Sequence, residues 1–98
     1  MLLKSPMEVV VAAAEFAPGA TMGRHTHHGD EYGTVVAGTF ELSVEGQAPK
    51  RINAGEAYHN GRDVIHETRN VGDGPGRIIS TFIIDKGRPL VEPVKADH

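Results

Sequence analysis

The sequence predicts a single all-β domain folded as a small antiparallel β-barrel. Short β-prone segments alternate with glycine and proline punctuation, and hardly any stretch has helical periodicity. With 98 residues, the chain is too short to build a second hydrophobic core. Closure into a barrel is favoured because it removes the exposed edges that so short a chain could not otherwise cover, although the pattern alone also fits a sandwich.

The expected strands follow one another at short intervals. The first is rich in β-branched and small residues and stops at the turn signal Pro18-Gly19. Residues 40–45 alternate apolar and polar side chains, which is typical of a half-buried strand. Residues 77–85 are too apolar for an edge strand. The expected extended segments are 8–17, 32–37, 40–45, 50–53, 56–60, 64–70 and 77–85.

Residues 1–98 thus form one domain, with a barrel over about 8–85 and a tail over 86–98. The tail carries two prolines and is expected to pack loosely along the surface or against a second subunit. Residues 9–14 are an apolar run of six, shorter than the core of about 7–15 that a signal peptide needs. No run can span a bilayer. We therefore expect a cytoplasmic protein, or a periplasmic one if an upstream signal was removed.

Composition excludes several classes of function. The chain has 10 Lys and Arg against 13 Asp and Glu, a net charge of −3, without long runs of either sign. Nothing therefore indicates nucleic-acid or membrane binding. Zero cysteines exclude disulfides, thiolate metal sites and thiol nucleophiles. Nucleophile motifs, phosphate loops and dinucleotide fingerprints are missing too, so any chemistry would run through a metal.

The six histidines are the unusual count, and His25 and His27 are the most informative pair. Two residues apart on a strand, they leave the same face roughly 6–7 Å apart and can converge on one cation. Glu31 follows after a glycine that allows a bend, and His66 could join only across a barrel interior. Such a set suits a divalent Fe, Mn, Ni, Cu or Zn ion and leaves two octahedral positions open. The alternative is a solvent-exposed polar turn.

The spacing around these histidines resembles that of the cupins. Gly19, five residues, His25-Thr26-His27, three residues, Glu31, six residues and Gly38 reproduce the first cupin motif. The second motif is matched less fully by Gly55, then Gly61 and Asp63 where the family usually has Pro and Gly, then His66 and Asn70.

The resemblance covers about residues 8–85 and implies a barrel of six or slightly more strands with a metal inside. It places the family's four metal ligands on His25, His27, Glu31 and His66. Gly19 and Gly38 fall on turn glycines, and Asn70 on a strand-end position. The resemblance also implies a homodimer formed through sheet contacts.

Other side chains are candidates for a substrate pocket. Alternation turns either Tyr58 or His59 inward, and Phe40 and Phe82 are expected to supply core and pocket wall. His28 should point away from its neighbour His27.

Three functions remain open for a small-molecule substrate or ligand. The first is an oxygen-using metalloenzyme of dioxygenase type, in which Glu31 is the catalytic candidate, as a ligand or as a base released from the metal. The others are a non-catalytic ligand-binding module and a metal-dependent isomerase of a sugar or keto acid.

Overall fold

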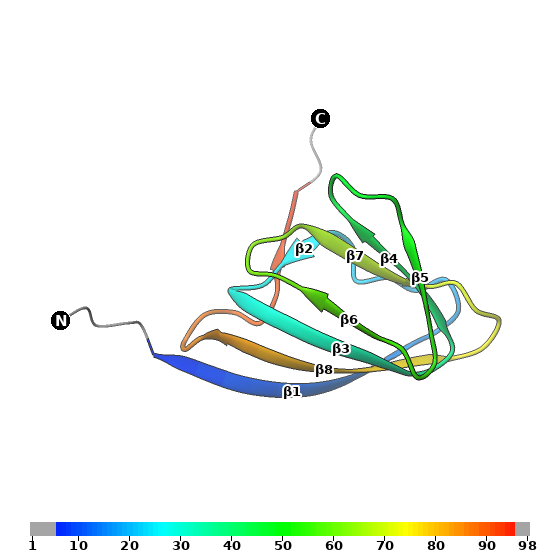
Figure 1. Ribbon diagram of the computed structural model, residues 1–98, viewed down its shortest axis with the longest axis horizontal. Helices are drawn as coiled ribbons and strands as arrows, with labels where there is room; N and C mark the ends of the chain where they lie inside the picture. Colours follow the sequence, from blue (N-terminus) through cyan, green and yellow to red (C-terminus); the bar gives the residue numbers. More distant parts are fainter. Residues whose placement is uncertain (1–5, 96–98) are drawn as a thin grey trace.

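The computed structural model describes residues 6–95, and in that range the chain forms β-strands and no helix (Figure 1). The expected domain ends at residues 1–5 and 96–98 lie outside the described residues. The strands are β1 Met7–Phe16, β2 His25–Thr26, β3 Gly29–Ala37, β4 Thr39–Val44, β5 Lys50–Asn53, β6 Ala57–Asn60, β7 His66–Asn70, β8 Gly76–Asp85 and β9 Glu92–Pro93.

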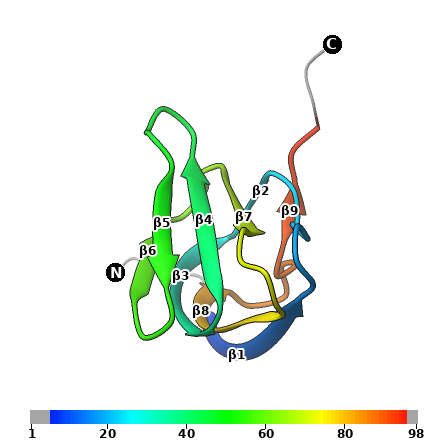
Figure 2. The same cartoon turned by 90° about the vertical axis from the view of Figure 1, so that its right-hand side faces the viewer.

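The strands form two antiparallel sheets that face each other (Figures 1 and 2). One has the order β1-β8-β3-β6 and the other β5-β4-β7-β2-β9. The prediction of an all-β antiparallel fold is confirmed. The apolar segment 77–85 indeed became a central strand, because β8 pairs with β1 on one side and with β3 on the other.

Alternation along each strand decides which side chains lie between the sheets. In β8, Ile78, Ser80 and Phe82 are buried, whereas their neighbours Ile79 and Ile83 face outward. A strand with apolar residues on both faces can bury only one of them against the facing sheet. The inward side chains of β8 thus supply both apolar core residues and a polar group.

The hydrophobic core fills one end of the space between the sheets. Phe16 and Phe40 meet edge to face there, with ring centroids 5.2 Å apart. The rest of this core consists of Val35, Leu42, Ile52 and Ile78. Strand β7 runs from the core end at Asn70, which pairs with Phe40, to His66. The interior therefore has an apolar end and an end that can take polar groups.

The tail differs from its prediction. Instead of packing loosely, the segment after β8 returns to the five-stranded sheet, where β9 pairs with β2 through Pro93 and His25. The Val94 amide also donates to the Arg24 carbonyl at 3.0 Å. A two-residue strand has too few positions to show a period of two, so the sequence pattern could not indicate it.

Candidate metal centre

Three imidazoles from separate places in the sequence meet at the polar end of the interior. His25 lies in β2 and pairs directly with His66, the first residue of β7, while His27 follows β2. Their ring centroids are 4.3–5.0 Å apart. One ligand atom from each of the three lies within 4.8 Å of the others, and all three residues are buried. The structure thus brings together the three histidines that the sequence singled out.

Backbone carbonyls fix the orientation of all three rings. The Nδ1 atoms of His25, His27 and His66 lie 2.8, 2.7 and 3.0 Å from the carbonyl oxygens of Gly23, Leu90 and Val64. A carbonyl oxygen only accepts, so each Nδ1 carries the proton and donates it. Each neutral ring then keeps a free lone pair on Nε2. The Nε2 atoms of His27 and His66 are buried and have no hydrogen-bond partner.

Glu31 brings a negative charge to this cluster from the other sheet. Its Oε1 lies 3.3 Å from Nε2 of His27 and 3.4 Å from Nε2 of His66. The Asn60 side-chain amide donates to Oε1 at 3.1 Å, and the Ser80 hydroxyl donates to Oε2 at 2.8 Å. Burial acts to raise the pKa of Glu31. In the metal-free chain, His27 and His66, when their Nε2 atoms carry a proton, act to lower it, as do the hydrogen bonds from Ser80 and Asn60, and together they hold the pKa well below its usual range. Glu31 is therefore a carboxylate and a weak proton acceptor.

Burial also sets the protonation of two neighbouring groups. It lowers the pKa of His25, despite the opposing hydrogen bond to the Gly23 carbonyl, and so favours the neutral ring that a metal ligand must have. Burial, followed by the charge of Glu31, raises the pKa of Tyr58 well above its ordinary value. The phenol thus stays protonated as a hydrogen-bond donor.

These groups fit a bound metal ion. With neutral rings, the Nε2 lone pairs of His27 and His66 face the Glu31 carboxylate without a proton between them, which is repulsive unless a cation lies among them. Three imidazole nitrogens and one carboxylate oxygen suit a first-row divalent ion. The backbone bonds at Nδ1 are the kind of support that orients histidine ligands.

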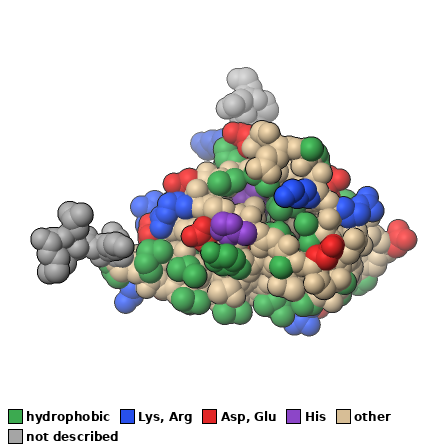
Figure 3. Space-filling view, in the orientation of Figure 1, with side chains coloured by type: hydrophobic (Ala, Val, Ile, Leu, Met, Phe, Trp, Pro, Cys, Tyr) green, Lys and Arg blue, Asp and Glu red, His purple; other side chains and the backbone are tan. Residues whose placement is uncertain are grey.

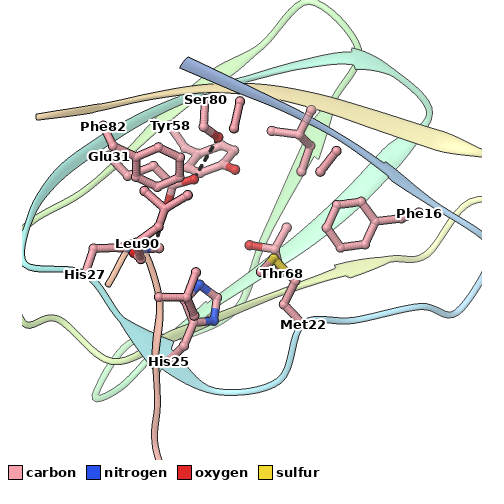
Figure 4. Close-up of a pocket in the computed structure, with 14 residues that line it drawn as sticks. Phe16, Met22, His25, His27, Glu31, Tyr58, Thr68, Ser80, Phe82 and Leu90 are labelled. Carbon is pink, nitrogen blue, oxygen red and sulfur yellow. Dashed lines mark hydrogen bonds and ion pairs between the residues drawn. The ribbon is translucent and has the colours of Figure 1, made fainter. Parts of the chain in front are cut away.

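A cavity of about 100 Å³ adjoins the cluster and is lined mainly by apolar side chains (Figure 4). His25, His27 and Glu31 lie along one part of its wall, and Phe16 and Met22 lie across from them. The Phe82 ring is 4.8 Å from that of His27, centroid to centroid.

Two of the three predicted pocket residues, Tyr58 and Phe82, line this cavity, but Phe40 does not. Phe40 is fully buried in the hydrophobic core, where it packs on Phe16. It lies near the end of β4 that is away from His66, since Val44 pairs with His66 and Phe40 pairs with Asn70. Alternation places a side chain between the sheets correctly, but it does not tell how far along the interior that side chain lies.

The remaining histidines of the described chain lie outside the cluster. His28 contacts Glu92 at 3.2 Å. Its side chain therefore does not join the cluster, in keeping with the expectation that it points away from its neighbour His27. His59 is exposed, contacts Asp30 at 2.9 Å and stacks on Tyr32, so Tyr58 is the inward residue of that pair.

Sequence reasoning missed several residues that contact the site, among them Ser80, Asn60, Leu90 and Val91. Ser80 and Asn60 occupy inward positions of β8 and β6, and strand alternation from Phe82 and Tyr58 could have found them. Leu90 and Val91 line the cavity from the tail, where only their apolar character was a signal.

A double-layered antiparallel β-fold with a buried histidine cluster defines the class of protein. The sequence matches the family described as "Cupin domain" over residues 12–82, and the chain belongs to that family. None of the described residues forms a helix long and apolar enough to cross a membrane.

Curated relatives include the HTH-type transcriptional regulator PuuR of Escherichia coli (strain K12), 38% identical over 66 residues. This match covers 66% of the present chain and 35% of the regulator, so the chain spans about a third of the length of that relative. The same figures hold for PuuR of Shigella flexneri.

Solved structures with the same fold include an oxalate oxidase, with a TM-score of 0.77 and 26% identity over 88% of this chain and 46% of that one. An RmlC-like cupin from Shewanella frigidimarina NCIMB 400 has a TM-score of 0.70 and 26% identity, covering 82% and 69% of the two chains. The DMSP lyase DddQ of Ruegeria pomeroyi DSS-3, at 22% identity and a TM-score of 0.75 over 83% and 41%, shares the fold.

Proposed function

We propose that this cupin binds one divalent transition metal through His25, His27, Glu31 and His66 and uses it on a small molecule in the adjoining cavity. The observation that carries the proposal is the set of Nδ1 bonds to backbone carbonyls, which turns the buried Nε2 atoms of His27 and His66 toward the Glu31 carboxylate. A bound metal of this kind supplies a Lewis acid, and for redox-active ions an electron donor, with positions open for substrate and dioxygen.

The protein's own groups would prepare the substrate. Phe82 and Leu90 line the cavity and exclude water, which strengthens charge interactions inside it. The Tyr58 phenol can donate a hydrogen bond to a substrate oxygen. Glu31, already held by Asn60 and Ser80, suits a ligand better than a base. A volume of about 100 Å³ admits only a substrate of a few heavy atoms.

A dioxygenase or oxidase acting on a small oxygen-rich acid or enediol is the reaction that we favour. The similarity to an oxalate oxidase at 26% identity supports including small dicarboxylates among the substrates. The test has two parts: elemental analysis with calorimetric titration of Mn, Fe, Ni, Cu and Zn, then oxygen uptake with enediols, diketones and dicarboxylates. His27→Ala should abolish both metal binding and oxygen uptake, whereas the exposed His59→Ala should leave both unchanged. Failure of every loaded form to turn over these substrates would refute the oxygenase.

A non-catalytic ligand-binding module is the second candidate, favoured by the 38% identity to a transcriptional regulator. In that case the metal would anchor a small carboxylate rather than activate it. Both candidates bind the metal, which at 100 times Kd stabilises a protein by about 2.7 kcal/mol, so turnover separates them and melting reports metal binding in each. A large loss of melting temperature with chelator, together with ligand binding and no turnover, would support the module.

We also propose a homodimer formed through the four-stranded sheet. Val9 and Val11 of β1 are 65% and 66% exposed, and Ile83, the β8 partner of Val9, is 39% exposed. Hydrophobic side chains are visible over this region along the lower part of Figure 3. Strand β1 is also the edge of its sheet, and ten consecutive residues pair with β8 without a bulge. Two copies of such an edge can pair with twofold symmetry. Light scattering after gel filtration should give a dimer, and Val11→Lys should give a monomer.

A further inference from the structure

A second and larger cavity shares part of its wall with the first. Its volume is about 350 Å³, and it is lined by β4, β5 and β6 together with residues of the loops that follow β4 and β6. Strands β5 and β6 are the edges of their sheets. Among the described residues, Tyr58 alone lines both cavities.

The walls of this cavity combine apolar and polar groups. Leu42, Ile52 and Val64 supply apolar surface, and Gln47 and Lys50 supply polar groups. Small-molecule sites usually have about 300–1,000 Å³ and carry a few polar groups that orient the ligand. The second cavity falls in this range, whereas the cavity beside the metal centre is below it.

Asn60 gives the second cavity a polar anchor. Asn60 lines it and is only 2% exposed. Its Nδ2 donates to Oε1 of Glu31 at 3.1 Å, which fixes the orientation of the amide because a carboxylate can only accept. Its Oδ1 is buried and has no hydrogen-bond partner. A buried acceptor without a donor costs about 1–3 kcal/mol. Because Oδ1 is closed off in the ligand-free chain, a ligand has to displace part of the cavity wall to reach it, and a donor that did so would recover this cost.

We propose that this second cavity is a ligand site for a small, mostly apolar molecule carrying one neutral hydroxyl or N–H group, and that Oδ1 of Asn60 accepts its hydrogen bond. The site needs no metal and goes beyond the function proposed above. Through Asn60, a ligand bound here would contact the group that holds Glu31.

The test compares p-cresol with p-xylene, which have nearly the same shape but differ by the hydroxyl. Both are titrated into the metal-free full chain, and amide chemical shifts are followed by NMR. The structure predicts saturable shifts at Leu42, Ala48 and Ala57 and not at Ala12 or Met22. It also predicts up to about tenfold tighter binding of p-cresol, since a hydrogen bond contributes about 0.5–1.5 kcal/mol net.

Three variants sharpen the test. Asn60→Leu should bring the two affinities to the same value while p-xylene still binds. Ala48→Trp, at an exposed position lining the cavity, should abolish binding of both probes without touching Asn60. Ala17→Trp, at an exposed position just after β1 that does not line the cavity, is the matched control and should leave both affinities unchanged. Equal affinities in the unaltered chain, shifts confined to the metal-side cavity, or no saturable shifts would each overturn the proposal.

Discussion

His27 donates its Nδ1 proton to the carbonyl oxygen of Leu90 at 2.7 Å, across 63 positions of sequence. Because this bond orients the ring, we predict that ending the chain after Arg88 lowers the affinity for Mn²⁺ or Ni²⁺ by about 10–100-fold, the usual cost of losing such support. Calorimetric titration measures the affinity, and circular dichroism checks that the β-fold persists.

Glu92→Gln is the control for this truncation, because it keeps the Leu90 carbonyl and removes only the negative charge that Glu92 places beside His28. Its metal affinity should stay that of the unaltered chain. An unchanged affinity in the truncated, folded chain would show that His27 needs no support from the tail.

Gly33 leaves room for the ring of Tyr58. A Cβ at position 33 would lie 2.3 Å from Cζ of that ring. We predict that Gly33→Ala lowers the free energy of unfolding by about 1–3 kcal/mol, as overpacking does, and that it costs less when added to Tyr58→Ala than when added to the unaltered chain. Gly74→Ala, where a Cβ meets nothing within 4 Å, should be nearly neutral. Denaturant unfolding of the four variants tests this, and additive effects would contradict it.

Asn70 ties three segments together at the apolar end of the interior. Its fully buried amide donates to the carbonyls of Phe16 and Gly74 and accepts from the Gly72 amide, each at 2.9 Å. Asn70→Asp replaces the donor with an oxygen and leaves two carbonyls unpaired. We expect a loss of about 2–6 kcal/mol, from about 1–3 kcal/mol for each orphaned group. Denaturant unfolding measures it, and the exposed Asn53→Asp should change stability by less than about 0.5 kcal/mol.

Asp63 is the only non-glycine residue of the described chain with a positive φ, at 61°. It stands where the second cupin motif, as the resemblance places it, usually has glycine, the residue that adopts this backbone conformation without strain. Left-handed backbone costs most L-residues about 1–2 kcal/mol, and a β-branched side chain tolerates it poorly. We therefore predict that Asp63→Val destabilises by about that amount in thermal or chemical unfolding, while Asp63→Gly is neutral or mildly stabilising. Asp73→Val in an ordinary turn should have little effect, and equal losses at both positions would refute the strain.

Arg62 and Asp85 form a two-bond ion pair at 2.8 and 2.9 Å on the surface. The hydrogen bond from Arg62 lowers the pKa of Asp85. A carboxyl whose pKa is lower in the folded state adds stability above its unfolded pKa and loses it as pH falls through the folded value. The stabilisation should therefore be complete above about pH 4, near the unfolded pKa of aspartate, and should be lost progressively as the pH falls below that value. NMR titration of the Asp85 carboxyl should show an upward shift in Arg62→Gln, and an unchanged midpoint would contradict the pairing.

The features that could be predicted from the sequence are those that depend on local periodicity. The alternation at residues 40–45 and the apolar run at 77–85 predict strands, and the two-residue spacing of His25 and His27 places both rings on one side. Features that depend on contacts between residues distant in the sequence could not be predicted from it. The return of the tail beside His25, the position of Phe40 along the interior and the second cavity all follow from how edges and turns meet in space. Short strands such as β2 and β9 leave no periodic signal.

The bond between His27 and Leu90 also sets an order of events during synthesis. A ribosome delivers the chain from its amino end, so His25, His27 and Glu31 emerge before Leu90, whose carbonyl orients the His27 ring. Until β9 has joined β2, the segment that carries the Leu90 carbonyl is not in place beside His27. If an ion binds as proposed, the geometry that holds it would therefore be complete only after this segment has docked.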